Sequence, residues 1–170
     1  MTYLTEPLDK KQKKHDVSNF DCGTPVLNTW LKTQAGQAAR KGYSITYVIT
    51  DDANFVLGYY AIVVRKFYPT ESLPIQFAEK FPAGTNVAIL ARLAVDLSQQ
   101  GKGVGALLLR EAMERIKGLA AETGDKLLIV DAKDGMVGFY EKYGFRPMPT
   151  DPQTLFLRID EIPESTNEDA

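Results

Sequence analysis

The chain has 170 residues, of which 44% are hydrophobic and 25% charged, a composition typical of a globular protein with one well-packed domain. No apolar run approaches the roughly 18 residues of a membrane span, and the first residues lack the pattern of a secretory signal, so neither membrane insertion nor secretion is expected. The single cysteine, Cys22, excludes an internal disulfide. These features predict a cytoplasmic protein with no membrane partner.

The net charge of −2 depends on an acidic C-terminal end. Residues 160–170 hold five acidic residues and no basic one, and without them 20 basic residues would face 17 acidic ones. We therefore expect a single domain over residues 1–160 and an acidic, disordered tail over residues 161–170. A nucleic-acid partner remains compatible with this charge. The N-terminal lysines are either a solvated segment or part of such a contact: Lys10, Lys11, Lys13 and Lys14.

The first predicted elements are a helix and a hairpin. A helix is expected over residues 24–40, with Thr24 as its N-cap and Pro25 in the first helical position. Two strands follow over residues 44–50 and 55–64, and the residues between them are typical of a turn.

The middle of the chain changes from irregular to buried structure. Residues 66–86 contain three prolines and are expected to be irregular, with at most a short helix over residues 75–80. Residues 87–95 are nearly all apolar, which predicts a strand buried on both faces, although Arg92 interrupts it.

Three further elements complete the predicted fold. An amphipathic helix is expected from Val104 to near Gly124, followed by a buried strand over residues 127–131. A short helix capped by Asp134 and a last strand over residues 154–159 come next. This order of elements predicts an α/β protein with one mixed sheet.

A glycine-rich segment, Gln100–Gly105, connects the buried strand to the amphipathic helix. The first N–H groups of a helix have no partner within it and the helix dipole favours negative charge there, so such a loop can bind a phosphate. Lys102 adds a positive charge. The segment lacks the third glycine of a dinucleotide site and the Lys-Ser/Thr pair of a Walker loop. From spacing alone, it is either a phosphate site or a tight turn.

Two motifs in order favour the phosphate site. Residues 100–105 read Gln-x-x-Gly-x-Gly, and residues 139–145 read Phe-Tyr-x-x-x-Gly-Phe. Both resemble motifs of the GNAT superfamily of acetyl-CoA-dependent N-acetyltransferases. The resemblance implies the GNAT fold, acetyl-CoA as co-substrate and no metal, with the strand before the loop pairing with the pantetheine arm. It gives a cofactor-binding role to Leu93, Ala94, Val95, Gln100, Gly101, Lys102, Gly103, Val104, Gly105, Ala106 and Phe139.

A narrower resemblance extends from His15 to Ile159. Residues 15–31, 91–96 and 149–155 are similar to the GNAT toxins of bacterial type II toxin–antitoxin systems, of the TacT and AtaT type. This resemblance implies acetylation of the α-amino group of aminoacyl-tRNA, which blocks translation. It also implies a homodimer and a ribbon-helix-helix antitoxin, through which alone the toxin would bind operon DNA. An ordinary GNAT enzyme for a small amine or a protein N-terminus, and a non-catalytic acyl-CoA-binding regulator, are the alternatives.

The resemblance assigns the catalytic proton to Tyr140. A phenol of pKa about 10 facing a thiol of pKa about 8.5 donates its proton slightly uphill, so a hydrogen bond in the transition state suffices. Tyr143 is the competing candidate and is expected to be an aromatic packed under Phe145 instead. A backbone N–H near Val95 is expected to stabilise the oxyanion.

A general base is harder to find. His15 is the only histidine and is distant from both motifs, so we expect a structural or surface role. Cys22 has no histidine nearby and is expected to be a small buried residue. An α-amino group of pKa about 7.7 is partly neutral at pH 7, whereas a lysine of pKa about 10.4 is not, so an α-amine substrate needs no strong base.

The remaining candidates are basic. A buried Arg92 needs a partner, which is either a carboxylate such as Asp96 or Asp131, or a phosphate of bound RNA. The residues considered for a tRNA contact are Arg40, Lys41 and Arg92, with Arg65 and Lys66 extending the same basic rim.

Overall fold

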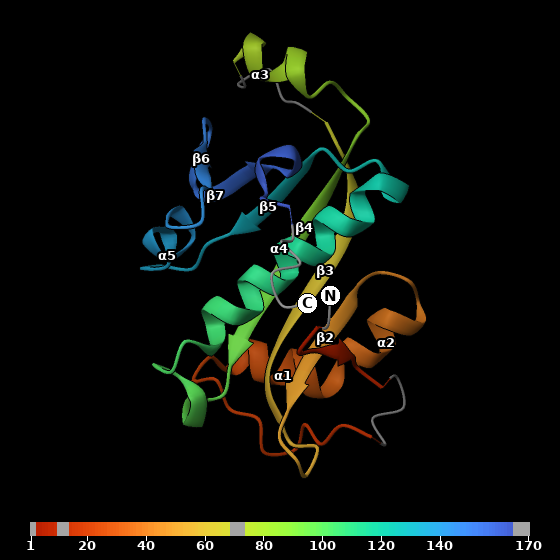
Figure 1. The fold of residues 1–170 in the computed structure, drawn as a ribbon, viewed down its shortest axis with the longest axis vertical. Coiled ribbons are helices and arrows are strands. Elements are labelled where there is room, and N and C mark those ends of the chain that lie inside the picture. Colours follow the sequence, from red (N-terminus) through yellow and green to blue (C-terminus); the bar gives the residue numbers. More distant parts are fainter. Residues whose placement is uncertain (1–2, 10–13, 69–73, 165–170) are drawn as a thin grey trace. The chain divides into compact units, whose positions relative to one another are not determined.

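The computed structural model describes residues 3–9, 14–68 and 74–164. They form two compact units (Figure 1). Of these described residues, those up to Val63 and Ala91–Ala112 belong to the first unit, and those from Val64 to Leu90 and from Met113 onward belong to the second. Of the N-terminal lysine cluster, only Lys14 lies in the described residues, where it forms an ion pair with Glu6.

Seven strands form one sheet in the order β1-β2-β3-β4-β5-β7-β6, with parallel and antiparallel neighbours. The strands are β1 (Glu6–Pro7), β2 (Ile45–Thr50), β3 (Val56–Phe67), β4 (Thr85–Val95), β5 (Leu127–Asp131), β6 (Arg146–Met148) and β7 (Asp151–Arg158). The helices are α1 (Pro25–Thr33), α2 (Ala35–Arg40), α3 (Ile75–Lys80), α4 (Val104–Thr123) and α5 (Val137–Glu141), with 3₁₀ turns η1 (Leu97–Gln99) and η2 (Ile159–Glu161). The predicted α/β class with a mixed sheet is confirmed.

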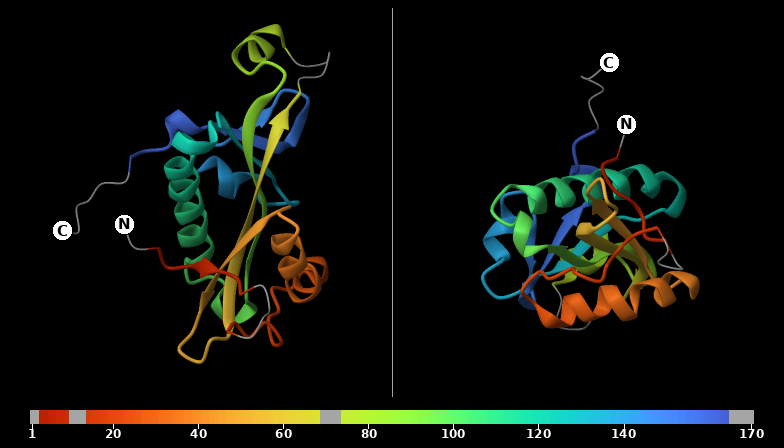
Figure 2. Two further views of the ribbon diagram at one scale, coloured as in Figure 1. Left: turned by 90° about the vertical axis from the view of Figure 1, so that its right-hand side faces the viewer. Right: turned by 90° about the horizontal axis from the view of Figure 1, so that it is seen from below.

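In the first unit, helices lie on both faces of the strands: α1 and α2 cover one face of β2 and β3, and the first half of α4 covers the other (Figure 2). Strands β2 and β3 are antiparallel, from Ile45 opposite Ile62 to Thr50 opposite Val56. The core beneath α1 includes Trp30, whose ring stacks on that of Tyr59 at 5.9 Å between centroids. These contacts fix α1 firmly to the sheet.

The single helix predicted over residues 24–40 is two helices in the structure. The hydroxyl of Thr33 donates to the carbonyl of Thr29 at 2.7 Å, a bond that bends a helix, and Gln34 leaves the helical region with φ −120°. Thr24 occupies the N-cap as predicted, but its side chain makes no capping hydrogen bond.

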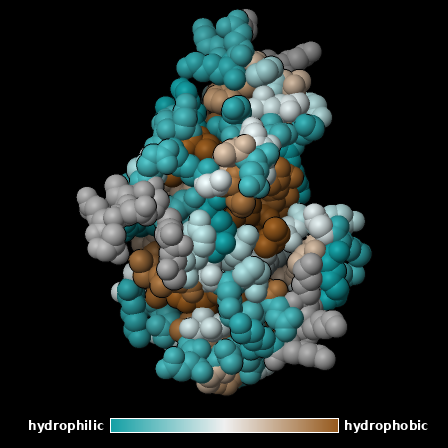
Figure 3. All heavy atoms as spheres, turned by 45° about the vertical axis from the view of Figure 1, so that its right-hand side comes forward, coloured by the Kyte–Doolittle hydropathy of each residue, from teal (hydrophilic) through white to brown (hydrophobic). Residues whose placement is uncertain are grey.

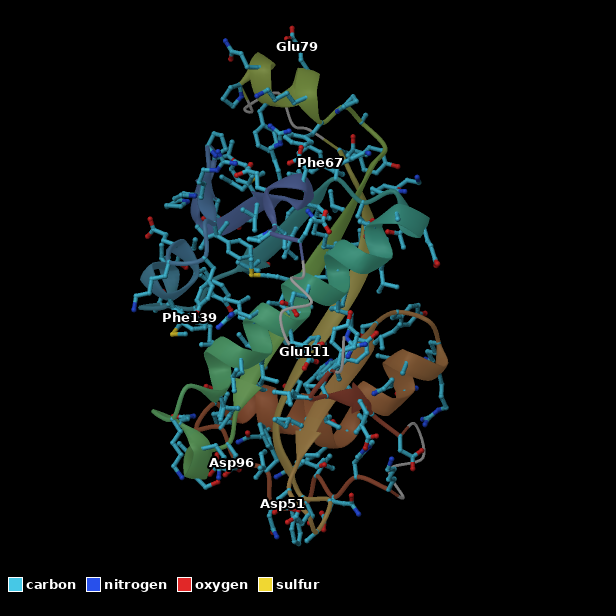
Figure 4. The ribbon with its side chains drawn as sticks, viewed as in Figure 1. Asp51, Phe67, Glu79, Asp96, Glu111 and Phe139 are labelled. Atoms are coloured by element: carbon cyan, nitrogen blue, oxygen red, sulfur yellow. The ribbon has the colours of Figure 1, made fainter. Side chains whose placement is uncertain are left out.

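Glu111, on α4, holds the N-terminal segment in place. Its buried carboxylate accepts hydrogen bonds from the backbone N–H groups of Leu4 and Thr5, from the Thr5 hydroxyl and, at 2.9 Å, from the Tyr60 hydroxyl. Several donors stabilise the buried charge, and these bonds anchor the segment that leads into β1 to α4. Figure 4 labels Glu111 on this helix. Neither β1 nor this buried carboxylate was predicted from the sequence.

In the second unit, β5 lies between β4 and β7. It is parallel to β4, with Val87 opposite Leu127, and antiparallel to β7. Aromatic rings fill the core beside α3, where Phe77 contacts Phe67, Phe81 and Phe156. The short helix expected over residues 75–80 is confirmed, while β6 was not predicted.

The expected capping of α5 by Asp134 is wrong. Met136 is the N-cap residue, and the carboxylate of Asp134 instead accepts a hydrogen bond from the Gln153 amide at 2.9 Å. Gly135 separates Asp134 from the helix with φ +80°, a turn that moves the carboxylate away from the first N–H groups.

The end of the described chain is packed. Ile162 is buried, Glu161 forms an ion pair with Arg146, and Glu164 forms one with Lys117. Residues 165–170, the rest of the predicted tail, lie outside the described residues. Within the described residues, no helix has the length and apolar character that crossing a bilayer requires.

Candidate active site

The end of β4 and the start of α4, both in the first unit, enclose the glycine-rich segment. The β4–β5 ladder ends at Leu90 opposite Val130, so residues 91–95 continue past it. Among these, Ala94 is buried, whereas Leu93 and Val95 are half-buried. The strand thus extends beyond its parallel neighbour over the residues that the sequence analysis assigned to the cofactor.

The glycine loop has the backbone of an anion site. Gly101 and Gly103 have φ +77° and +83°, and an added Cβ at either position would meet no atom within 4 Å. These glycines are therefore required by backbone conformation and not by lack of space. The N–H of Leu107 donates to the carbonyl of Gly103 at 3.1 Å, so the N–H groups of residues 104–106 precede the first bond of α4. Lys102 is exposed beside them.

Gln100 connects the loop to its surroundings. Its amide nitrogen donates to the carbonyls of Val95 and Cys22, each at 2.9 Å. The side chain therefore acts within the protein and fixes the first residue of the motif.

A close approach of three elements keeps β4 in place. A Cβ added to Gly58 on β3 would lie 3.0 Å from Leu108 Cδ1 and 3.2 Å from the carbonyl oxygen of Ala94. Only glycine allows β3, the end of β4 and α4 to pack at this distance.

Tyr140, in the second unit, lies in an aromatic cluster. Its ring is buried and contacts Phe139 at 5.1 Å and Phe145 at 5.8 Å between centroids. Burial raises the pKa of Tyr140 to about 12. The hydroxyl makes no hydrogen bond to any residue that the structure describes. The phenol is thus held protonated at neutral pH and is available to donate.

Tyr143 is a packed aromatic, as expected. Its ring lies 5.8 Å from that of Phe139, which Figure 4 labels on α5, and it is half-buried. Its ring partner is Phe139, not the Phe145 expected from the sequence.

Arg92 has a third kind of partner. Its guanidinium carbon lies 4.1 Å from the centroid of the Trp30 ring, a cation–π contact. Within the described residues it forms no ion pair with Asp96 or Asp131, so the carboxylate alternative is wrong, because an aromatic face beside β4 supplies the contact instead. Contact with an RNA phosphate stays a prediction. Burial lowers the pKa of Arg92, which nevertheless remains charged.

His15 and Cys22 are structural, as predicted. Nδ1 of the buried His15 accepts from the Asp9 N–H at 2.9 Å, which leaves the proton on Nε2, 2.7 Å from a carboxylate oxygen of Glu6. Cys22 is buried, and its N–H donates to the side-chain oxygen of Asn28 at 2.8 Å. Neither side chain is placed to act as a base.

The other basic residues considered for a tRNA contact lie near the end of a helix or a strand. Arg40 and Lys41 are exposed at the end of α2 in the first unit. Arg65 and Lys66 are exposed near the end of β3 in the second, where the Lys66 ammonium donates to the Asn86 side chain at 3.1 Å.

The fold and the glycine loop define an acetyltransferase of the GNAT class: residues 42–147 match the acetyltransferase (GNAT) domain, and the chain belongs to this family. This chain is 34% identical over 143 residues to the tRNA-acetylating toxin of Mycobacterium tuberculosis, and the match covers 84% of this chain and 85% of that one. It is also 29% identical over 167 residues to "Probable toxin TacT" of Sinorhizobium fredii, covering 92% and 91%.

Solved structures of toxins are similar over almost the whole chain. AtaTR bound with AcCoA matches with TM-score 0.80 and 29% identity, covering 93% of this chain and 94% of that one. AtaT complexed with acetyl-methionyl-tRNAfMet matches with TM-score 0.79 and 28% identity, covering 93% and 95%. The AtaT–AtaR complex bound to DNA matches with TM-score 0.76 and 28% identity, covering 95% and 97%.

Proposed function

We propose that this chain is a toxin that transfers the acetyl group of acetyl-CoA to the α-amino group of aminoacyl-tRNA and so blocks translation. The observation that carries the proposal is the similarity, over nearly all of the chain, to a toxin solved with acetyl-methionyl-tRNA. That match covers 93% of the chain, whereas the matched acetyltransferase domain spans residues 42–147.

The residues of the first unit fit the diphosphate of acetyl-CoA. The free N–H groups at the start of α4, the open space at Gly101 and Gly103, and the charge of Lys102 would bind its phosphates. The extended backbone of Leu93–Val95 would pair with the pantetheine arm. The same proposal assigns supporting contacts to Val104, Gly105, Ala106 and Phe139.

Acetyl-CoA supplies the acetyl group: a C–N bond to the amine forms, the C–S bond breaks, and the amine loses a proton to water. A backbone N–H near Val95 would stabilise the oxyanion. Tyr140 would hydrogen-bond to the departing thiolate and then give it the phenolic proton, which the tyrosine regains from water. Burial keeps the phenol protonated beforehand, whereas its raised pKa makes the transfer itself uphill.

The choice of an α-amine as substrate rests on whether the protein offers a base that could deprotonate the amine. His15 is engaged at both ring nitrogens, so it offers no base. An α-amino group of pKa about 7.7 is partly neutral already, which a lysine amine of pKa about 10.4 is not. Arg92, Arg40 and Lys41 would contact the tRNA backbone.

The partners belong to the same proposal. We expect a ribbon-helix-helix antitoxin, operon DNA bound only through it, a homodimer and a cytoplasmic location. Large hydrophobic side chains that remain exposed, such as Val26 (74%) and Tyr43 (68%), support a further protein contact. Figure 3 shows apolar side chains reaching the surface among hydrophilic ones on the face drawn there.

Expression of the chain without an antitoxin tests the proposal. Growth should stop and charged tRNA should carry N-acetylated amino acids, detected by mass spectrometry of the aminoacyl end. Tyr140→Phe should restore growth, whereas the matched control Tyr143→Phe should remain toxic. Normal growth with free α-amines on charged tRNA would contradict the toxin function and favour an ordinary N-acetyltransferase. A chain that binds but never turns over acetyl-CoA would indicate a regulator.

A further inference from the structure

The loop between β4 and α4 has little regular structure of its own. Residues 96–103 form one 3₁₀ turn and then contain two glycines with positive φ and open space around them. Glycine has the largest conformational freedom to lose, so such a loop does not hold one conformation unless other residues fix it. The contacts that fix it come from the segment before α1, which runs beside the loop in Figures 1 and 2.

Asp21 makes the first attachment. Its N–H donates to the carboxylate of Asp96 at 2.9 Å, and its carbonyl accepts from the N–H of Leu97 at 2.8 Å. Asp96, labelled in Figure 4, also accepts from the N–H and hydroxyl of Ser98. Burial opposes its ionisation, but these hydrogen bonds outweigh burial and lower the pKa of Asp96. The start of the loop is thus bonded to Asp21 in both directions.

Cys22 makes the second attachment. Its carbonyl accepts from the Gln100 amide at 2.9 Å, and the same amide nitrogen bonds to the carbonyl of Val95. The first residue of the glycine motif is therefore tied to the N-terminal segment and to the end of β4.

Asn28, in the first turns of α1, holds both attachments. Its side-chain oxygen accepts from the Cys22 N–H at 2.8 Å, and its nitrogen donates to the Asp21 carboxylate at 2.9 Å. The Gly23 N–H donates to the same Asp21 oxygen at 2.9 Å. Both hydrogen bonds lower the pKa of Asp21, and the bond from Gly23 lowers it more than the bond from Asn28. The Asp21 carboxyl therefore stays ionised at neutral pH. Because α1 is packed in the core through Trp30, the turn over residues 21–23 has a rigid support.

We propose that residues 21–23 and Asn28, here called the brace, position the glycine loop to bind the diphosphate of acetyl-CoA. Asn28 is a positioning residue that acts through Asp21 and Cys22. The inference rests on the proposed function for its ligand. It also gives a role to the Phe-Asp-Cys-Gly segment at residues 20–23, which the chemistry of acetyl transfer leaves unused.

Binding of coenzyme A by isothermal titration tests the brace. Asn28→Ala should raise Kd for coenzyme A, and KM for acetyl-CoA, by about tenfold, equivalent to 1.4 kcal/mol. At saturating acetyl-CoA, kcat should stay within about twofold of wild type, since the variant disturbs binding and not the proton donor. Asp21→Ala, at an exposed side chain, should act alike, whereas Asp21→Asn keeps the acceptor oxygen and should restore wild-type binding.

The matched control is Tyr59→Phe. It removes a buried hydrogen bond to α1, from the Tyr59 hydroxyl to the Leu27 carbonyl at 2.8 Å, and leaves the hydrogen bonds of the brace in place. It should lower stability and leave Kd for coenzyme A unchanged. The brace is contradicted if folded Asn28→Ala and Asp21→Ala both bind coenzyme A like wild type, or if Tyr59→Phe weakens binding as much as they do. A wild type that binds no coenzyme A would contradict the proposed function, and the brace with it.

Discussion

Tyr140 combines two properties that a proton donor to a thiolate needs. Its ring is packed among Phe139 and Phe145, which fixes its orientation, and its hydroxyl is not engaged by any described residue. The raised pKa, about 12, means that the phenol is a weak acid that does not lose its proton to water at neutral pH. Transfer of this proton to the departing thiolate, whose acid has a pKa of about 8.5, is uphill, so the hydroxyl would first donate a hydrogen bond as the C–S bond breaks and the proton would follow later.

Tyr140→Phe removes this donor and leaves the ring packing intact. We expect kcat to fall by roughly 10²- to 10³-fold, within the range of general acid catalysis, while KM for acetyl-CoA changes little. Steady-state kinetics with charged tRNA measures both constants, with Tyr143→Phe as the control. A fall in kcat of less than threefold would remove Tyr140 from the mechanism.

The same residue gives an alkaline signature. The folded state holds the Tyr140 proton to about pH 12, whereas an unfolded tyrosine loses it near pH 10. The stabilisation is therefore complete below about pH 10 and is lost as the pH rises through about 12. The free energy of unfolding, measured with denaturant from pH 9 to pH 11.5, should fall less steeply in Tyr140→Phe than in wild type. Equal slopes would mean that the phenol is not buried in solution.

At the scale of elements, the turn from β4 into α4 determines whether the helix can receive a phosphate. Gly101 and Gly103 adopt the left-handed region, and η1 and the brace set where this turn begins. The loop geometry thus depends on segments about 75 residues apart in sequence, since Asp21 bonds to Asp96.

A comparison of Gly103→Ala with Gly84→Ala separates the effect of backbone strain in the glycine loop from the effect of similar strain elsewhere in the chain. An alanine at positive φ costs about 1–2 kcal/mol, and no neighbouring atom obstructs its methyl group. We expect a moderate loss of stability and a several-fold higher Kd for coenzyme A, because the loop relaxes away from its binding conformation. Gly84→Ala has the same positive φ and the same open space, in the loop before β4. It should lose similar stability, measured by thermal unfolding, with Kd unchanged; an equal rise in Kd for both would contradict the role of the loop.

Local patterns predicted most elements because hydrophobic periodicity and glycine positions are properties of neighbouring residues. The strand over residues 127–131, the helix from Val104 and the short helix over residues 75–80 were found in this way. Strand β1 could not be predicted, since its two residues pair with the distant strand β2, and Leu4 and Thr5 before it bond to the distant carboxylate of Glu111. In the sequence, the one indication of a buried carboxylate was the position of Glu111, three residues after Leu108 on the apolar face of α4.

The site was predictable in part for the same reason. The glycine motif and the Phe139-Tyr140 pair are local, and the glycine φ values agree with the anion loop expected from the sequence. The cation–π contact of Arg92 with Trp30 and the bonds of Asn28 join segments far apart in the chain. No spacing rule contains them, so only the structure reveals them.

The proposed tRNA substrate is a polyanion, whereas the net charge of the chain is −2. The acidic residues are concentrated at the C-terminal end, and those within the described residues are partly neutralised, as Glu161 is by Arg146. Contacts to tRNA would then depend on local basic groups such as Arg40 and Lys41, and binding should weaken as salt increases.

Purified components reveal which amine the protein acetylates. The protein would be incubated with isotopically labelled acetyl-CoA and a mixture of aminoacyl-tRNAs, and the aminoacyl ends analysed by mass spectrometry. We expect labelled acetyl groups on the α-amino nitrogen of charged tRNA with wild-type protein, and a rate reduced by roughly 10²-fold or more with Tyr140→Phe. Turnover of acetyl-CoA onto a small amine or a protein N-terminus, with every charged tRNA retaining a free α-amine, would contradict it.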